Sequence, residues 1–297
     1  MKRRNVELET EFAELVGIAC DGHSMQGFLR NNNGPTAFVE AFDKEYAYET
    51  INNVFGENTT YELYCRARFG EQANLPFFVF IYDSFIDDIN CITKYRICVG
   101  ENHSYEIVDT VCMSEENLIQ WWQQQTYHIN NPRPYRPQML ERLRESRFDR
   151  ILEGNDINCE NGIKWGQNID LFIMSEDGND VIAIVENRFA SAESRYNTIA
   201  SYNPIRQAQN INGLDNNNGD YYSFRNLNQL RNQLDIPFYL ATYSRLLSES
   251  NRMGICEVYG VRNSDRQVLL RYDGNIHQPS DNIFEDAEEV NRWIRKH

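Results

Sequence analysis

Two acidic residues stand at the outer ends of two apolar runs, where their spacing would allow them to act together. Asp170 opens the run DLFIM, and Glu186 closes the run VIAIVE. The polar segment Ser175–Asp180 between these runs favours a tight turn around Gly178. Because Gly178 is midway between Asp170 and Glu186, a symmetric hairpin of two strands places the two acidic residues opposite each other.

Such a pair of carboxylates is suited to binding a metal ion. Directly opposed residues share one face of a hairpin, with Cβ atoms about 4.5–5.5 Å apart. Carboxylates at that distance repel each other unless a cation lies between them, and a divalent metal takes oxygen ligands of this kind. Arg188 points to the same face as Glu186, because side chains repeat every two residues along a strand. The hairpin thus carries a set suited to cleaving a phosphodiester.

Helices and strands alternate around this hairpin. We expect a helix over Gln138–Glu153, then the hairpin, a second helix over Phe224–Asp235 and a strand over Pro237–Tyr243. Pro237 is tolerated at the start of a strand, where its missing N–H is not needed. The alternation predicts an α/β fold with a mixed central sheet flanked by helices.

The chain also contains an internal repeat. The run LPFFVFIY at Leu75–Tyr82 resembles IPFYLATY at Ile236–Tyr243. Each run is followed by a short strand that ends near a cysteine, Cys98 or Cys256, and then by a helix that leads from acidic residues to a tryptophan. Matched order over several elements favours duplication over chance.

Aligned by this repeat, the first half keeps one residue of the candidate site. Glu40 takes the place of Glu186, whereas Gln26 stands where Asp170 would be, and Phe42 replaces the basic residue. An amide and a phenyl ring cannot bind a hard cation as a carboxylate can. The first half is therefore predicted to be a degenerate copy. An irregularly spaced alternative in the same half consists of Asp21, Glu40 and Lys44.

A proline-rich segment predicts the boundary between the halves. Residues 128–137 contain PRPYRP, whose prolines favour extended polyproline II backbone and cannot continue a helix. We therefore expect domains over residues 1–127 and 138–297, joined by this linker.

Composition narrows the functional classes. No apolar run in the 297 residues approaches the length of about 18 that a membrane span needs, and the start MKRRNVELETEF lacks the apolar region of a secretory signal. The formal net charge of −15 argues against indiscriminate nucleic-acid binding but allows a local basic patch. Seven scattered cysteines without CxxC or zinc spacing predict free thiols and a cytoplasmic location.

The second half resembles the PD-(D/E)XK, or restriction-endonuclease-like, nuclease superfamily over about Gln138–Tyr243. That family has a helix with a glutamate, a strand with an aspartate, a strand ending in ExK, a helix and a strand. The run IDLFI…IAIVENR is similar to a bacterial branch with an IENK motif. The resemblance implies two restriction-endonuclease-like units, each with a mixed central sheet flanked by helices, the first of them degenerate.

The resemblance also implies an activity and a set of site residues. It implies an endonuclease of bacterial restriction or antiviral defence that depends on Mg²⁺ or Mn²⁺ and acts on nucleic acid, with DNA as the expected substrate. A second copy or a defence-complex protein would be its partner, and no membrane is involved. The implied metal ligands are Asp170, Glu186 and the carbonyl of Asn187, and the implied catalytic set is Glu145, Asp170, Glu186 and Arg188. Glu145 also fits a solvated helix position with ion pairs to neighbouring charges.

Arg188 stands where the family has a lysine, and this difference separates two functional classes. Arginine cannot be deprotonated in proteins, so Arg188 cannot be a general base. It can still orient water or neutralise charge that develops on a phosphate. An active protein would be a metal-dependent nuclease. An inactive one would be a nuclease-fold scaffold or a nucleic-acid-binding subunit of a multi-protein defence complex, and the sequence leaves both classes open.

Overall fold

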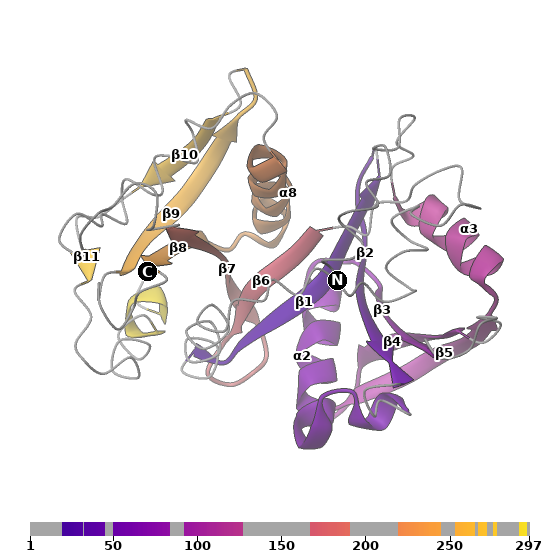
Figure 1. Cartoon of the computed structure of the whole chain (residues 1–297). Coiled ribbons are helices and arrows are strands. Elements are labelled where there is room, and N and C mark those ends of the chain that lie inside the picture. The colour runs from indigo at the N-terminus through magenta and orange to yellow at the C-terminus, as the bar shows by residue number, and fades with distance from the viewer. Residues whose placement is uncertain are drawn as a thin grey trace. The chain divides into compact units, whose positions relative to one another are not determined.

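The computed structural model describes residues 20–31, 33–44, 50–83, 92–126, 167–190, 219–244, 253–264, 267–271, 276–277 and 291–295. The chain divides into two compact units, each defined by contacts among its own residues. Figure 1 shows the elements of both. Unit 1 comprises Met1–Arg4 and Met25–Asn168, and unit 2 comprises Asn5–Ser24 and Ile169–His297. Within the described part of the chain, no helix combines the length and apolarity needed to cross a membrane.

Unit 1 is an α/β unit with a mixed sheet. Its strands have the order β1-β2-β3-β4-β5, in which β2 and β3 are parallel and the other neighbours are antiparallel. The chain enters β3 through a helix, as a parallel connection requires. The elements are β1 (Gly22–Asn31), β2 (Gly34–Asp43), the short helices η2 (Ile51–Asn53) and η3 (Gly56–Asn58), α2 (Thr59–Gln72), β3 (Phe77–Tyr82), β4 (Ile92–Val99), β5 (Tyr105–Met113) and α3 (Glu115–Gln125).

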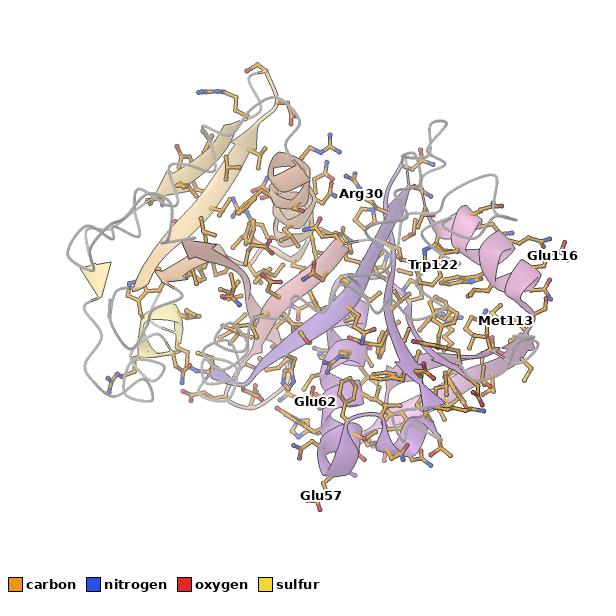
Figure 2. The ribbon with its side chains drawn as sticks, viewed as in Figure 1. Arg30, Glu57, Glu62, Met113, Glu116 and Trp122 are labelled. Carbon is orange, nitrogen blue, oxygen red and sulfur yellow. The ribbon has the colours of Figure 1, made fainter. Side chains whose placement is uncertain are left out.

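The core of unit 1 lies on both faces of β3, whose six residues FFVFIY are all buried. On one face α2 packs Phe69 onto Phe38 of β2, with ring centroids 4.6 Å apart. On the other face Trp122 of α3 lies 5.5 Å from Phe80 of β3. Figure 2 shows Trp122 on the inner side of α3 and Glu116 on its outer side.

Unit 2 is also α/β, with strand order β6-β7-β8-β9-β10. Here β7 and β8 are parallel, and the other neighbours in that order are antiparallel. The helix α8 connects β7 to β8 and packs against β7, β8, β9 and β10. The elements are β6 (Gln167–Met174), β7 (Val181–Ala190), α8 (Gly219–Leu234), β8 (Phe238–Ser244), β9 (Met253–Arg262), β10 (Gln267–Arg271), β11 (Ile276–His277) and a final helix over residues 291–295.

The first strand pair of each unit has the same register. In unit 1 Gly27 pairs with Val39, and in unit 2 Leu171 pairs with Val185. Both ladders then shift at a bulge three residues further along the first strand, between Leu29 and Arg30 or between Ile173 and Met174. These partners agree with the alignment of Glu40 with Glu186 that the sequence predicts.

The turn from helix to parallel strand is repeated as well. Leu75 N–H donates to Gly70 O at 2.8 Å, and Ile236 N–H donates to Arg231 O at 3.2 Å. Just before each donor, a non-glycine residue has a left-handed backbone, Asn74 with φ 53° and Asp235 with φ 55°. The predicted correspondence of the two helix–proline–strand segments is therefore present in the backbone.

One part of the predicted repeat is wrong. Cys256 pairs with Leu240 of β8, whereas the residue that pairs with the matching Val79 of β3 is Tyr95. Cys98 and Cys256 are therefore not equivalent, because the short RIC and GIC motifs lie at different positions along their strands.

Several predicted segments fall outside the described residues. They include the linker over residues 128–137 and the helix over Gln138–Glu153, so the predicted domain boundary stays a prediction. The predicted helix over Phe224–Asp235 is present as α8, which begins earlier, at Gly219. The strand predicted over Pro237–Tyr243 is β8, shifted by one residue.

Candidate metal site of unit 2 and its counterpart in unit 1

The turn that positions the acidic pair of unit 2 has the predicted chemistry. Ser175 N–H donates to Asp180 O at 2.7 Å, and Gly178 N–H donates to Ser175 O at 2.9 Å. Gly178 has φ 69°, a left-handed conformation that glycine adopts without steric cost. The Asp177 carboxylate accepts hydrogen bonds from the Ser175 hydroxyl at 2.6 Å and the Asn179 N–H at 3.1 Å, which closes the tip.

The ladder of this hairpin sets Asp170 against Glu186. Leu171 pairs with Val185, so the next residues outward are Asp170 on β6 and Glu186 on β7. Directly opposed residues of an antiparallel pair share a face. Glu186 is buried, with 5% of its surface exposed, and Asp170 is partly buried. The register thus predicts one face for both acidic residues, and burial leaves the charge of Glu186 poorly screened by water.

A backbone hydrogen bond fixes the Asp170 side chain. Asn187 N–H donates to Asp170 Oδ2 at 2.8 Å. Because the N–H and C=O of one strand residue point to the same side, the Asn187 carbonyl is also directed toward β6. The carboxylate of Asp170 and the carbonyl of Asn187 therefore lie along the same side of β7.

The other predicted site residues are only partly described. Arg188 belongs to β7, where it pairs with Thr242 of β8, and its side chain lies outside the described atoms. Glu145 lies outside the described residues altogether. Among the residues that are described, no group of three or more His, Cys, Asp or Glu side chains is placed to hold a metal. The register places Asp170 and Glu186 next to the paired Leu171 and Val185, and the third carboxylate stays unassigned.

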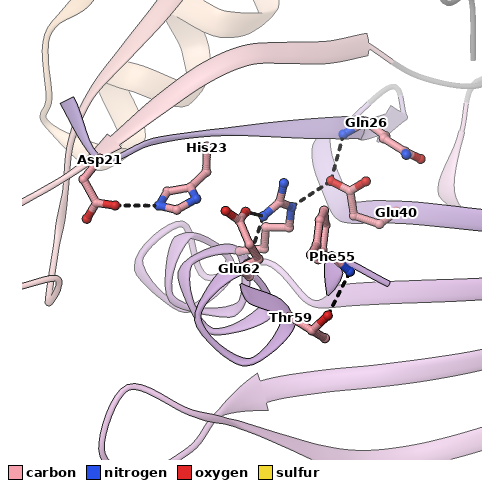
Figure 3. A network of polar contacts seen from close by, with 8 residues as sticks. Asp21, His23, Gln26, Glu40, Phe55, Thr59 and Glu62 are labelled. Carbon is pink, nitrogen blue, oxygen red and sulfur yellow. Dashed lines mark hydrogen bonds and ion pairs between the residues drawn. The ribbon is translucent and has the colours of Figure 1, made fainter. Parts of the chain in front are cut away.

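Unit 1 has the same arrangement with an amide in place of one carboxylate. Ala41 N–H donates to Gln26 Oε1 at 2.9 Å, as Asn187 N–H donates to Asp170 in unit 2. In return, Gln26 N–H donates to Glu40 Oε1 at 3.1 Å (Figure 3). Gln26, rather than Asp21, is therefore the residue opposite Glu40. The alternative trio that included Asp21 and Lys44 has no support from this register, and the Asp21 carboxylate lies 3.2 Å from His23 Nε2.

An arginine from α2 reaches the carboxylate of Glu40. Arg66 Nε donates to Glu40 Oε1 at 3.0 Å. A second nitrogen of the guanidinium donates to Glu62 Oε2 at 2.5 Å and to the Glu62 carbonyl at 2.9 Å. The exposed fractions of the side chains are 3% for Arg66 and 1% for Glu40, so this ion pair is fully enclosed. Through these hydrogen bonds Arg66 links the carboxylates of Glu40 and Glu62, both labelled in Figure 3.

Aromatic and hydroxyl groups complete this network. The Arg66 guanidinium carbon lies 4.1 Å from the centroid of the Phe55 ring, a cation–π contact. The Thr59 hydroxyl accepts from Phe55 N–H at 2.8 Å and donates to the Gly56 carbonyl at 2.8 Å, which holds Phe55 beside the first turn of α2.

Burial and charge act on these groups in opposite directions. Burial raises the pKa of the Glu40 carboxyl, and the charge and hydrogen bond of Arg66 oppose that rise. For Arg66, burial lowers the pKa, but the charges and hydrogen bonds of Glu40 and Glu62 together outweigh burial and raise the pKa above its ordinary value. The guanidinium is therefore a permanent cation inside unit 1.

Arg66 and Glu62 are not among the residues that the sequence predicted for a site. Their spacing of four residues on a helix is a signal for an ion pair. The same spacing occurs on many solvated helices, so it does not indicate that Arg66 turns inward to a strand. That contact depends on how α2 is rotated about its axis against the sheet.

No protein-family model, curated protein or solved structure matches this chain.

Proposed function

We propose that unit 2 is a phosphodiesterase that depends on Mg²⁺ or Mn²⁺ and cleaves nucleic acid, as an endonuclease of bacterial restriction or antiviral defence. The observation that carries the proposal is the register of β6 and β7, in which Asp170 and Glu186 come directly after the Leu171–Val185 pair, with Asn187 N–H bonded to Asp170 at 2.8 Å. The defence context comes from the sequence resemblance alone.

The order of elements supports the same family. In unit 2 an antiparallel pair carries the two acidic residues, the helix α8 follows, and β8 returns parallel to β7. This is the strand–strand–helix–strand order of the PD-(D/E)XK core. Agreement at the level of a fold is an analogy, so the activity has to be argued from the site.

The donor set of unit 2 fits a hard divalent cation. Asp170 and Glu186 supply carboxylate oxygens and Asn187 supplies a carbonyl oxygen directed toward β6, and Mg²⁺ and Mn²⁺ prefer such ligands. When bound, the metal would lower the pKa of a water molecule and polarise the phosphate.

The chain's own residues would position the metal ligands and neutralise charge on the phosphate. Asn187 N–H holds the Asp170 carboxylate in one orientation. Burial of Glu186 keeps its charge poorly screened, which strengthens its attraction for a cation. Arg188 follows Glu186 by two residues on β7, and the period of a strand predicts the same face for both. From there Arg188 would hold a phosphate oxygen, but it cannot take a proton.

Asp170→Asn tests the proposal. The variant keeps an acceptor oxygen for Asn187 N–H and removes only the charge, so unit 2 should fold while cleavage falls by roughly 10²-fold or more, the loss usual for a single preorganised group. The matched control is Asp180→Asn, an exposed residue at the tip of the same hairpin, which should cleave at the wild-type rate. Plasmid, single-stranded DNA and RNA would be incubated with each protein over a range of Mg²⁺ and Mn²⁺ concentrations. Equal cleavage by Asp170→Asn and wild type would refute the site.

A second function, a nuclease-fold scaffold or nucleic-acid-binding subunit without catalysis, is favoured by one feature. Arg188 replaces the lysine of the family motif. Under the enzyme proposal, Arg188→Lys retains or raises cleavage, because lysine keeps the charge and can also release a proton when buried. If both wild type and Arg188→Lys are inert on every nucleic acid, the scaffold function is the one that remains.

A further inference from the structure

We infer that the Arg66 side chain supplies in unit 1 the positive charge that a bound divalent metal would supply in unit 2, so that each chain takes one metal ion, in unit 2. The part that concerns unit 2 rests on the proposed function. The part that concerns unit 1 stands on contacts within that unit.

The acidic positions of the two units are equivalent. Glu40 and Glu186 both follow, by one residue, a valine that is paired within the first hairpin. Each also pairs with a buried aliphatic residue of the parallel strand, Val79 or Leu240. The two glutamates therefore occupy the same place in the same local structure, and their neighbours can be compared one by one.

The helices can be compared in the same way. The hydrogen bonds that end them make Gly70 of α2 equivalent to Arg231 of α8. Counting back four residues makes Arg66 equivalent to Leu227, a residue with 0% of its surface exposed. Where unit 1 directs a guanidinium at its glutamate, α8 thus carries an uncharged leucine.

Two differences between the units both disfavour a metal ion in unit 1. Unit 1 has Gln26 where unit 2 has Asp170, and Arg66 where unit 2 has Leu227. The first difference removes an anionic metal ligand, and the second adds a cation that is hydrogen-bonded to the remaining carboxylate at 3.0 Å. Gln26 offers Glu40 a backbone N–H and no charge. This donor set does not fit a hard cation, because its one inward carboxylate is already engaged by arginine.

Removing the charge of Arg66 should therefore destabilise unit 1 by an amount that depends on pH. Among the described residues, the charged groups that act on Glu40 are Arg66 and Glu62, both on α2. Without Arg66, the folded-state pKa of Glu40 would rise further above its unfolded value. A raised folded-state pKa gives stability at low pH that is lost as pH rises through it. The loss of folding stability caused by Arg66→Leu should thus be larger at pH 8 than at pH 5.

The first experiment measures melting temperatures with a chelator present. Arg66→Leu should melt roughly 10 °C below wild type at pH 8, as expected for an uncompensated buried charge. Glu40→Gln added to Arg66→Leu should recover most of that shift and remove its pH dependence. The matched control is Arg68→Leu, which breaks an exposed pair with Glu71 on the same helix and should shift melting by no more than about 2 °C.

Two results of this experiment would overturn the unit 1 part of the inference. One is an equal shift for Arg66→Leu at both pH values. The other is a double variant, Arg66→Leu with Glu40→Gln, that is no more stable than Arg66→Leu alone. If Arg66→Leu does not fold, the double variant still decides, because it must fold and give a measurable melting temperature.

The second experiment counts Mn²⁺ ions by isothermal titration calorimetry. Wild type should bind one ion per chain and Asp170→Asn none. Asp170→Asn combined with Gln26→Asp and Arg66→Leu should bind one ion again, now in unit 1. Two ions on wild type, or one on Asp170→Asn, would overturn the inference. No ion on wild type would overturn the proposed function and the unit 2 part with it, and the melting experiment would still decide the unit 1 part.

Discussion

At the scale of single residues, an equivalent backbone N–H in each unit holds the side chain opposite the glutamate, whether that side chain is a carboxylate or an amide. Asn187 N–H bonds to Asp170 in unit 2, and Ala41 N–H bonds to Gln26 in unit 1. A carboxylate and an amide both offer an acceptor oxygen, so this contact tolerates either side chain. Charge at the position is therefore free to differ while the strand pair keeps its geometry.

The tip of the β6–β7 hairpin provides a pH prediction at the same scale. Hydrogen bonds from the Ser175 hydroxyl, and then from Asn179, lower the pKa of Asp177 from 3.8 to about 2. Because the folded-state pKa lies below the unfolded value, the stabilisation is complete above the unfolded pKa and is lost as pH falls from 3.8 toward about 2. NMR titration of wild type should show this low midpoint, and Ser175→Ala should move it back toward 3.8. An unshifted midpoint in wild type would show that these bonds do not persist in solution.

At the scale of elements, the turn that leads from α2 toward β3 in unit 1 requires a glycine. A Cβ on Gly70 would lie 2.8 Å from the carbonyl oxygen of Leu75, a backbone atom that cannot move aside cheaply. The hydrogen bond that closes this turn is 2.8 Å long in unit 1, from Leu75 N to Gly70 O, and 3.2 Å long in unit 2, from Ile236 N to Arg231 O. The wider turn of unit 2 accommodates a residue with a side chain.

Gly70→Ala should therefore destabilise unit 1, although alanine is the better helix former. The steric cost of about 1–3 kcal/mol outweighs a propensity gain of about 1 kcal/mol. Arg231→Ala is the matched change in α8; it keeps a Cβ at the position and loses an exposed hydrogen bond to Tyr259 O, so it should cost less. Urea unfolding of both variants gives the comparison. A more stable Gly70→Ala would mean that the helix end shifts to make room.

Elements were predictable from the sequence where their signals are local. The hairpin around Gly178 follows from turn residues and a period of two, and its predicted register matches the pairing of Leu171 with Val185. The Arg66–Glu40 pair joins residues 26 positions apart and depends on the rotation of a helix, which no local pattern encodes. The Cys98–Cys256 match failed because a short motif can slide along a strand without changing its appearance.

At the scale of the whole chain, two units with separate cores should unfold separately. The α/β class and the mixed sheets follow from the alternation of helices and strands. We expect two transitions in differential scanning calorimetry. Saturating Mn²⁺ should raise only one of them, by roughly 5–10 °C, because a ligand stabilises the unit that binds it by mass action.

Asp170→Asn should remove this shift and leave the other transition where it was. Equal shifts of both transitions with Mn²⁺ would indicate binding to each unit or nonspecific binding to the acidic surface of a chain with a net charge of −15. The Asp180→Asn protein serves as the control at an exposed position.

Each of the two hairpins has a bulge between its tip and the end that carries Glu40 or Glu186. Four residues lie between Arg30 and its partner Pro35, whereas six lie between Met174 and its partner Val181. Below the bulge the pairing is the same in both units, so a change in tip length has been absorbed without moving the residues that face each other further down. A protein engineer could therefore splice a peptide tag or a fluorescent reporter next to Gly178 and still leave Asp170 across from Glu186.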